Sequence, residues 1–247
     1  MLVDTHCHIH EPDYALAIDE VMSHARATSV GQMICVGTSL ESTAQAVSFA
    51  ARYENCFASI GVHPHDTKDG FDVRPFADAD KVVAVGEIGL DYYYSHSPRE
   101  VQIAALKAQL EVALEYDLPV IFHVRDAFDD FWPIFDSYEG IRGVLHSFTD
   151  TTENMQKAVD RGLYIGVNGI STFTKDTNQQ LMFDAIPLDR LLFETDAPFL
   201  TPKPFRGKVN EPALVATIAA YHAHRRNLSV ETLSGATTAN AHALFAL

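Results

Sequence analysis

The sequence predicts a (β/α)8 barrel, with one domain over residues 1–247, and three observations predict it. Eight short apolar runs alternate with longer segments of helical periodicity, an order typical of parallel strands joined by helices. The runs are apolar throughout rather than at every second residue, as expected for strands that are covered on both faces. The length of 247 residues also suits one barrel of roughly 250 residues.

The apolar runs give the expected strands in chain order, and each ends where polar or turn-forming residues begin. The third run is the weakest, because the segment that follows it, 67–80, is polar and short on helical pattern. The predicted strands are 1–5, 32–36, 57–61, 82–87, 120–123, 143–146, 163–167 and 191–194.

The intervening segments show the spacing of amphipathic helices. The clearest is 98–116, where Val101, Ala105, Leu106 and Leu110 recur at helical steps. The Pro-rich stretch 197–204 is predicted to be a long loop after the last strand. The predicted helices are 14–28, 42–53, 98–116, 128–138, 152–161, 178–185, 211–226 and 230–247.

Composition excludes several classes of protein. Lys and Arg number 18 and Asp and Glu 33, and the resulting net charge of −15 disfavours sequence-blind wrapping of nucleic acid. It leaves open a site where metal ions, rather than basic side chains, meet a phosphate. The three cysteines show no paired spacing typical of a disulfide framework. The chain shows neither a secretory signal nor a run of ~18 apolar residues, so we expect no membrane span and a cytoplasmic location.

Two histidines end the first predicted strand. His6 and His8 are separated by one residue, so in a strand both imidazoles project from the same face. Such a pair is a workable clamp for a metal ion. Taken alone, such a pair is more often two surface histidines than a metal clamp.

Ligand-type residues also end four later strands. Glu87, His123, His146 and Asp196 each stand where an apolar run stops or shortly after it. Active sites of such barrels are assembled at the C-terminal ends of the strands, so these residues are expected to meet. Imidazoles with carboxylates suit zinc, manganese or a similar ion. Six ligands are too many for one tetrahedral site and suit two ions that share a carboxylate.

Seven segments of the sequence resemble the TatD-type deoxyribonucleases, a branch of the metal-dependent hydrolases with amidohydrolase-like barrels. They follow one another in order and span nearly the whole chain. The segments are 3–8, 61–65, 86–93, 118–127, 145–149, 194–200 and 206–212.

The resemblance implies a division of roles among the six ligands. One ion would be held by His6, His8 and Asp196, and the second by His123 and His146. Glu87 would bridge the two ions, at the position where phosphotriesterase-like and dihydroorotase-like relatives carry a modified lysine. This difference favours the nuclease-like branch. Asp196 and Glu87 are the expected catalytic residues, with Asp196 taking the proton from the attacking water.

Four further residues are candidates for substrate binding. His63 matches a family position close to the metal pocket, whereas His65, two residues later, could equally be structural. Arg206 and Lys208 would be phosphate contacts in an acidic chain, although a solvated basic loop is an equal alternative. Asn210 is expected to cap the helix that follows.

The remaining acidic and histidine residues have less specific expectations. Asp4, which also matches the family, is expected to orient a ligand histidine from behind. The other histidines have no partner motif and are predicted to lie on the surface. They are His10, His24, His96, His222, His224 and His242.

The function implied by the resemblance is hydrolysis of DNA phosphodiester bonds by a metal-bridged hydroxide, with two divalent ions (Zn, Mn or Mg). The expected substrate is single-stranded or frayed DNA, attacked from an end. An alternative is hydrolysis of another ester or an amide, as in a D-aminoacyl-tRNA deacylase, which would make tRNA the partner. A non-catalytic metal-binding scaffold is a third possibility, disfavoured by the intact Asp196 and Glu87.

Overall fold

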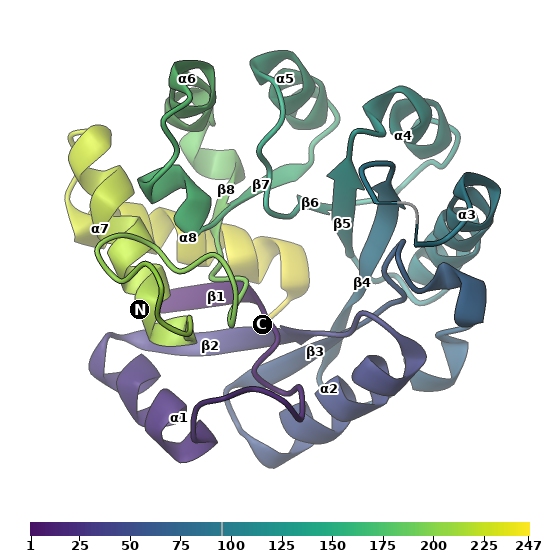
Figure 1. The fold of residues 1–247 in the computed structure, drawn as a ribbon, viewed down its shortest axis with the longest axis horizontal. Helices are drawn as coiled ribbons and strands as arrows, with labels where there is room; N and C mark the ends of the chain where they lie inside the picture. Colours follow the sequence, from purple (N-terminus) through teal and green to yellow (C-terminus); the bar gives the residue numbers. More distant parts are fainter. Residues whose placement is uncertain (95) are drawn as a thin grey trace. The chain divides into compact units, whose positions relative to one another are not determined.

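A computed structural model of the chain describes residues 1–94 and 96–247 as two compact units. One unit comprises Met1–Ile34 with His146–Leu247, and the other comprises Cys35–Leu145. Strands and helices alternate along the chain (Figure 1). The fold class predicted from the sequence, a (β/α)8 barrel, is confirmed. The single domain over 1–247 stays a prediction.

The observed elements correspond one to one with those predicted. The strands are β1 (Leu2–Cys7), β2 (Val30–Val36), β3 (Cys56–Ile60), β4 (Val82–Asp91), β5 (Val120–Arg125), β6 (Gly143–Leu145), β7 (Tyr164–Val167) and β8 (Leu191–Phe193). The α-helices are α1 (Ile18–Ala27), α2 (Leu40–Arg52), α3 (Arg99–Glu115), α4 (Phe128–Phe135), α5 (Thr152–Asp160), α6 (Thr177–Ala185), α7 (Val215–Arg225) and α8 (Val230–Phe245).

Within Cys35–Leu145, strands β3 to β6 lie side by side in sequence order. The parallel register pairs Ile60 with Val85, Val85 with Val120, and Val120 with Gly143. Helices α2, α3 and α4 pack on β3, β4 and β5 respectively. Parallel pairing brings the C-terminal ends of these strands to one edge, which is where polar side chains of β4 and β5 can meet.

Strands β4 and β5 continue past the ends predicted for them. The pairing runs through Gly89 with His123 to Asp91 with Arg125. The predicted ends at 87 and 123 were therefore wrong, because a polar side chain does not interrupt a ladder built from backbone groups. An irregularity in register between Val85 and Ile88 falls at Glu87. Such bulges re-aim side chains near functional sites.

Within the other unit, β7 and β8 form a parallel pair with β1 next to β8. The register runs from Ile165 with Leu191 to Val167 with Phe193. Beyond β8, Ala197 forms a parallel bridge with Cys7. Strand β1 extends past its predicted end at residue 5, and His6 lies within the strand. Helices α7 and α8 pack against β1 and β8.

Side chains at the helix starts explain where several helices begin. The caps of α2, α5, α6 and α8 each accept a hydrogen bond from a backbone N–H in the first turn. The caps are Ser39, Thr151, Asp176 and Ser229. The polar segment after β3 forms two short 3-10 helices, Thr67–Asp69 and Arg74–Phe76, in agreement with its weak helical pattern.

Two of the histidines expected at the surface are buried, so that prediction was wrong for His10 and His222. His222 is 0% exposed on α7, and its Nε2 lies 2.9 Å from Ser171 Oγ. Burial, followed by the nearby charge of Arg226, lowers the pKa of His222 from 6.5 to about 3. Periodicity does not separate such a histidine from a surface one, because imidazole is tolerated in both places when its nitrogen has a partner.

His222 should make stability depend on pH. Its pKa in the folded chain, about 3, lies below the unfolded value of 6.5. The unfolded chain therefore binds this proton first, and stability falls as the pH drops from 6.5 towards 3. When the pH falls from 7 to 5, the free energy of unfolding of the parent should decrease by roughly 1–2 kcal/mol more than that of His222→Gln. Urea unfolding at both pH values measures this, with His224→Gln, at an exposed position of the same helix, as control. Equal pH dependence in both variants would contradict it.

Across residues 1–94 and 96–247, the helices are too short or too polar to cross a bilayer.

Candidate metal centre

The end of β1 brings two imidazoles together. His6 and His8 are both buried, and their Nε2 atoms lie 3.1 Å apart. The two rings meet edge to face, with centroids separated by 4.9 Å. This arrangement confirms the expectation that residues i and i+2 of the strand present both imidazoles together.

The segment after β8 brings Asp196 to the same pair. The backbone N of His8 donates to Ala197 O at 2.7 Å, and the backbone N of Asp196 donates to His6 O at 2.8 Å. Asp196 Oδ1 consequently lies 3.4 Å from His8 Nε2 and 3.7 Å from His6 Nε2. Asp196 has a φ of 56°, in the left-handed region that aspartate tolerates better than most residues.

His146 completes this group. Its ring stacks on that of His6 with a centroid distance of 3.8 Å and an interplanar angle of 17°. Its Nδ1 lies 3.3 Å from Oε1 of Glu194, a buried carboxylate that also accepts a hydrogen bond from Ser147 N at 2.6 Å. With Nδ1 near this carboxylate, Nε2 is the nitrogen that would coordinate an ion.

A second group lies on β4, on β5 and in the segment after β3, in the unit Cys35–Leu145. Glu87 Oε1 is 2.9 Å from His123 Nδ1 and 3.4 Å from His63 Nε2. The backbone N of His65 donates to His63 Nδ1 at 3.2 Å. His63 therefore carries its proton on Nε2 and donates it towards Glu87.

The carboxylate of Asp91 contacts His123 and His65. Asp91 Oδ2 lies 3.0 Å from His123 Nε2 and 3.0 Å from His65 Nε2. Burial raises the pKa of Asp91, but hydrogen bonds from His123, Tyr94 N and His65 outweigh it and hold that pKa well below its usual range. An ionised carboxylate on Nε2 orients the His123 ring so that Nδ1 faces Glu87.

A glycine allows β4 to approach β5 at this point. Gly89 has a φ of +152°, and a Cβ built on it would lie 1.8 Å from His123 O. Only a residue without a side chain fits so close to another backbone. Gly89 thereby keeps Glu87 and His123 on adjacent strands within contact distance.

One side chain in each group has a pKa shifted by its surroundings. Burial raises the pKa of Asp196, but the hydrogen bond from His8 and the charges of His146, His6 and His8 hold it below the usual range. Burial, with the nearby charge of His123, lowers the pKa of His63 from 6.5 to about 4. Near neutral pH, therefore, Asp196 is a carboxylate and His63 is an uncharged imidazole.

Both groups have the donor chemistry of a metal site. One ligand atom from each of His6, His146 and Asp196 falls within 4.8 Å of the others, and the same holds for His63, Glu87 and His123. Imidazole nitrogens that face each other and a carboxylate suit zinc, manganese or a related ion. Three predicted ligands, His6, His146 and Asp196, therefore meet in one unit, and Glu87 and His123 meet in the other together with His63, which was predicted to contact substrate. The pairing of His123 with His146 on one ion stays a prediction. The number and identity of the ions, and the sharing of Glu87 between them, stay predictions.

Asp4 and Asn210 both contact the backbone next to Asp196. Asp4 also accepts a hydrogen bond from His6 N at 3.4 Å, and its expected role beside a ligand histidine stays a prediction. Asp4 accepts hydrogen bonds from Thr195 N at 2.8 Å and from Thr195 Oγ1 at 2.5 Å, and burial raises its pKa to about 8. Asn210 donates to Thr195 O and Phe199 O, instead of capping the next helix. Both residues therefore hold the backbone around Asp196. The helix cap prediction was wrong: the side-chain oxygen of Asn210 accepts from the N–H of the next residue, Glu211, at 3.0 Å, and the short 3-10 helix Pro212–Leu214 begins directly after Glu211.

The two predicted basic residues lie on the exposed segment between β8 and α7. The guanidinium of Arg206 packs 3.9 Å from the centre of the Phe173 ring and donates to Thr201 O at 3.0 Å. The ammonium of Lys208 lies 5.7 Å from the centre of the Phe205 ring. Contact of either residue with a substrate phosphate stays a prediction, as it does for His63 and His65.

Glu194 is a site residue that the sequence reasoning missed. It closes the apolar run of β8 two residues before Asp196, and that position was the available signal. Glu194→Gln should weaken metal binding and lower metal-dependent activity about 10–100-fold, the usual effect of losing the partner of a ligand histidine. Metal titration alongside kcat measures this, with Glu153→Gln on α5 as a solvent-exposed control. Unchanged metal affinity would contradict the positioning role.

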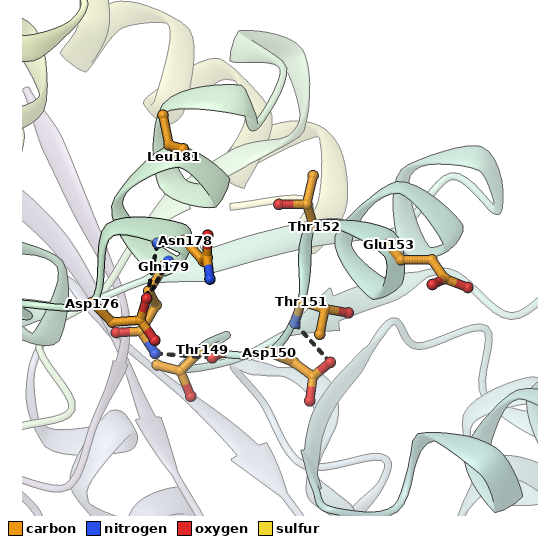
Figure 2. A pocket seen from close by; sticks show the side chains of 9 residues that line it. All are labelled: Thr149, Asp150, Thr151, Thr152, Glu153, Asp176, Asn178, Gln179 and Leu181. Atoms are coloured by element: carbon orange, nitrogen blue, oxygen red, sulfur yellow. Dashed lines mark hydrogen bonds between the residues drawn. The ribbon is translucent and has the colours of Figure 1, made fainter.

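A cavity of about 580 Å³ opens between the beginnings of α5 and α6 (Figure 2). Figure 2 shows Asp176 accepting from the backbone of Asn178 and Gln179, while the Gln179 side chain donates to Thr149 O. Three carboxylates line the cavity, those of Asp150, Glu153 and Asp176. This acidic lining disfavours phosphate, so the chemistry is assigned to the histidine groups instead.

Comparison with known proteins places these groups in a family context. Residues 3–246 match the family described as TatD related DNase. The uncharacterized metal-dependent hydrolase YabD of Bacillus subtilis (strain 168) is 36% identical, over 99% of each chain. The 3'-5' ssDNA/RNA exonuclease TatD of Enterobacter lignolyticus (strain SCF1) is 38% identical, over 99% of this chain and 98% of its own. The crystal structure of YJJV, a TatD homolog from Escherichia coli K12, superposes with a TM-score of 0.92 at 30% identity, over 100% of this chain and 98% of its own.

Proposed function

Because this chain belongs to the family of TatD related DNases and is a metal-dependent hydrolase, we propose that it hydrolyses the phosphodiester bonds of single-stranded DNA from a strand end. The observation that carries the proposal is the donor set of His6, His8, His146 and Asp196 on one face of a family member. A relative named as a 3'-5' ssDNA/RNA exonuclease supports the choice of substrate.

The proposed centre takes two divalent ions, Zn, Mn or Mg, with the ligands distributed as the family resemblance implies. Bound ions would neutralise charge on the phosphate and lower the pKa of an attacking water. Glu87 supports this assignment, because its buried carboxylate lies 2.9 Å from His123 Nδ1 and 3.4 Å from His63 Nε2, which brings one carboxylate and two imidazoles to one place.

The protein's own residues carry the proton and hold the geometry. Hydrolysis joins a water oxygen to phosphorus and breaks the bond from phosphorus to the leaving sugar oxygen. We assign the water proton to Asp196, whose lowered pKa keeps it ionised and able to accept. Asp4 and Asn210 keep the backbone of Asp196 in place, and Glu194 and Asp91 orient His146 and His123.

The test is a direct comparison of substrates. The purified protein is incubated with end-labelled single-stranded DNA, single-stranded RNA and a D-aminoacyl-tRNA, each with Zn²⁺, Mn²⁺ or Mg²⁺ and with a chelator. We expect DNA to shorten nucleotide by nucleotide, the chelator to stop the reaction, and added metal to restore it. Release of the amino acid with DNA left intact would replace the nuclease by the deacylase alternative. No metal-dependent turnover of any of these substrates would overturn the proposal. The cytoplasmic location stays a prediction.

A further inference from the structure

We propose that Tyr93, Tyr94, His96 and Arg125 form a platform on which bases of a single-stranded nucleic acid stack. The four side chains gather beyond the C-terminal ends of β4 and β5, in the unit Cys35–Leu145. The inference rests on the proposed nuclease function and adds to it a binding site for the bases, which the metal-ligand groups do not supply.

The platform consists of exposed aromatic side chains with one arginine. Tyr93 is 57% exposed and Tyr94 is 43% exposed, although large aromatic side chains are usually more buried. Their ring centroids lie 4.7 Å apart, and Tyr94 stacks on His96 at 5.5 Å with an interplanar angle of 26°. The guanidinium of Arg125 lies 3.8 Å from the centre of the Tyr93 ring. Aromatic rings and guanidinium planes are the side chains on which unpaired bases stack.

The loop that carries the tyrosines is held from inside the unit rather than by the rings themselves. Asp91 Oδ1 accepts hydrogen bonds from Tyr93 N at 2.9 Å and Tyr94 N at 3.0 Å. The buried amide of Gln102 donates to Asp91 O at 3.1 Å and to Ser97 O at 3.0 Å. A platform that is ordered before the strand arrives loses less entropy when it binds.

The platform is joined directly to the metal-ligand group. The second oxygen of Asp91, Oδ2, is the atom that receives His123 and His65. The rings form a continuous series, with His65 6.3 Å from His123 and Tyr94 5.4 Å from His65. A cavity of about 520 Å³ lies beside it, lined in part by Asp91, Tyr94 and His96, within the usual roughly 300–1,000 Å³ of ligand clefts.

Stacking also accounts for how a chain with a net charge of −15 could hold a polyanion. Counterion release by many lysines and arginines is the common source of affinity, and an acidic protein has little of it. Stacking does not depend on net charge and contributes to every base in turn. Arg125 supplies one local positive charge at the rings.

The experiment compares a DNA strand that has all its bases with the same strand carrying an abasic residue at the 3' end. On the complete strand, Tyr93→Ala and Tyr94→Ala should each raise KM about 5- to 150-fold and leave kcat nearly unchanged, as expected for loss of one stacked base. Tyr93→Phe and Tyr94→Phe keep the ring face and should retain the parent KM. On the abasic strand, the alanine variants should show little further loss.

Two controls separate stacking from folding. Tyr53→Ala removes a tyrosine that also lies beside an arginine, Arg52, but precedes β3 at the opposite end of the sheet, so its KM should not change. A 2-aminopurine base at the 3' end, whose fluorescence falls on stacking, reports binding without turnover, and alanine variants should quench it less. If the alanine variants keep the parent KM and quenching while the parent cleaves DNA, the platform is overturned and the nuclease proposal stands. If the parent cleaves no nucleic acid with any metal, the nuclease proposal fails, and the platform fails with it.

Discussion

Asp196→Asn is expected to lower kcat on a DNA oligonucleotide by about 10²–10⁴-fold, the usual contribution of a positioned general base. Asparagine has nearly the shape of aspartate and still offers an oxygen to an ion, but it cannot accept a proton. The contacts of Asp196 Oδ1 with His6 and His8, at 3.7 Å and 3.4 Å, can therefore persist in the variant. The expected result is much reduced turnover with most of the metal and substrate binding retained.

The measurement is kcat together with metal stoichiometry in the same preparations. Asp117→Asn is a matched control, because Asp117 also has a left-handed φ, 53° against 56° for Asp196, and is exposed before β5. It should leave kcat unchanged. Asp196→Ala removes the ligand oxygen as well and should lose metal. Near-normal kcat in Asp196→Asn would sink the proton-transfer role, and loss of metal in that variant would assign the defect to ligation alone.

Glu87→Ala should remove most of the activity, by on the order of 100-fold or more, because loss of even a ligand's partner typically costs about 10–100-fold. Glu87 is buried and is the carboxylate that His63 and His123 both approach. Without the Glu87 carboxylate, the imidazoles of His63 and His123 are left without the negative charge that lies between them. Metal content should fall by at least one equivalent per chain, and a larger fall would agree with the bridging role that the family resemblance implies.

Glu87→Gln keeps the volume and one oxygen, and so separates loss of charge from loss of packing. We expect it to hold metal more weakly than the parent and to unfold at a similar temperature. Metal analysis, kcat and thermal unfolding are compared for the three proteins. Full activity with normal metal content in Glu87→Ala would refute the assignment of Glu87 to the centre.

Local sequence patterns were sufficient to predict the fold class and to select the candidate metal ligands. Parallel strands covered on both faces need continuous apolar runs, and the helices between them need apolar residues at steps of three and four. Both patterns can be recognised within short segments of the sequence. The pair His6 and His8 follows from the two-residue repeat of a strand. The strand ends were less predictable, because β4 and β5 continue through polar residues as long as their backbones pair.

The order of elements, the parallel arrangement and the residue types at the strand ends can therefore be predicted from local patterns. Which side chains meet depends on contacts between segments that are far apart in the chain. Asp196 reaches His6 and His8 because Cys7 pairs with Ala197, a contact between residues far apart in the chain. Asp91 serves His123 with one oxygen and the tyrosine loop with the other, and Glu194 turns to His146. Such contacts depend on chain closure and on hydrogen bonds between distant segments, which no local period records.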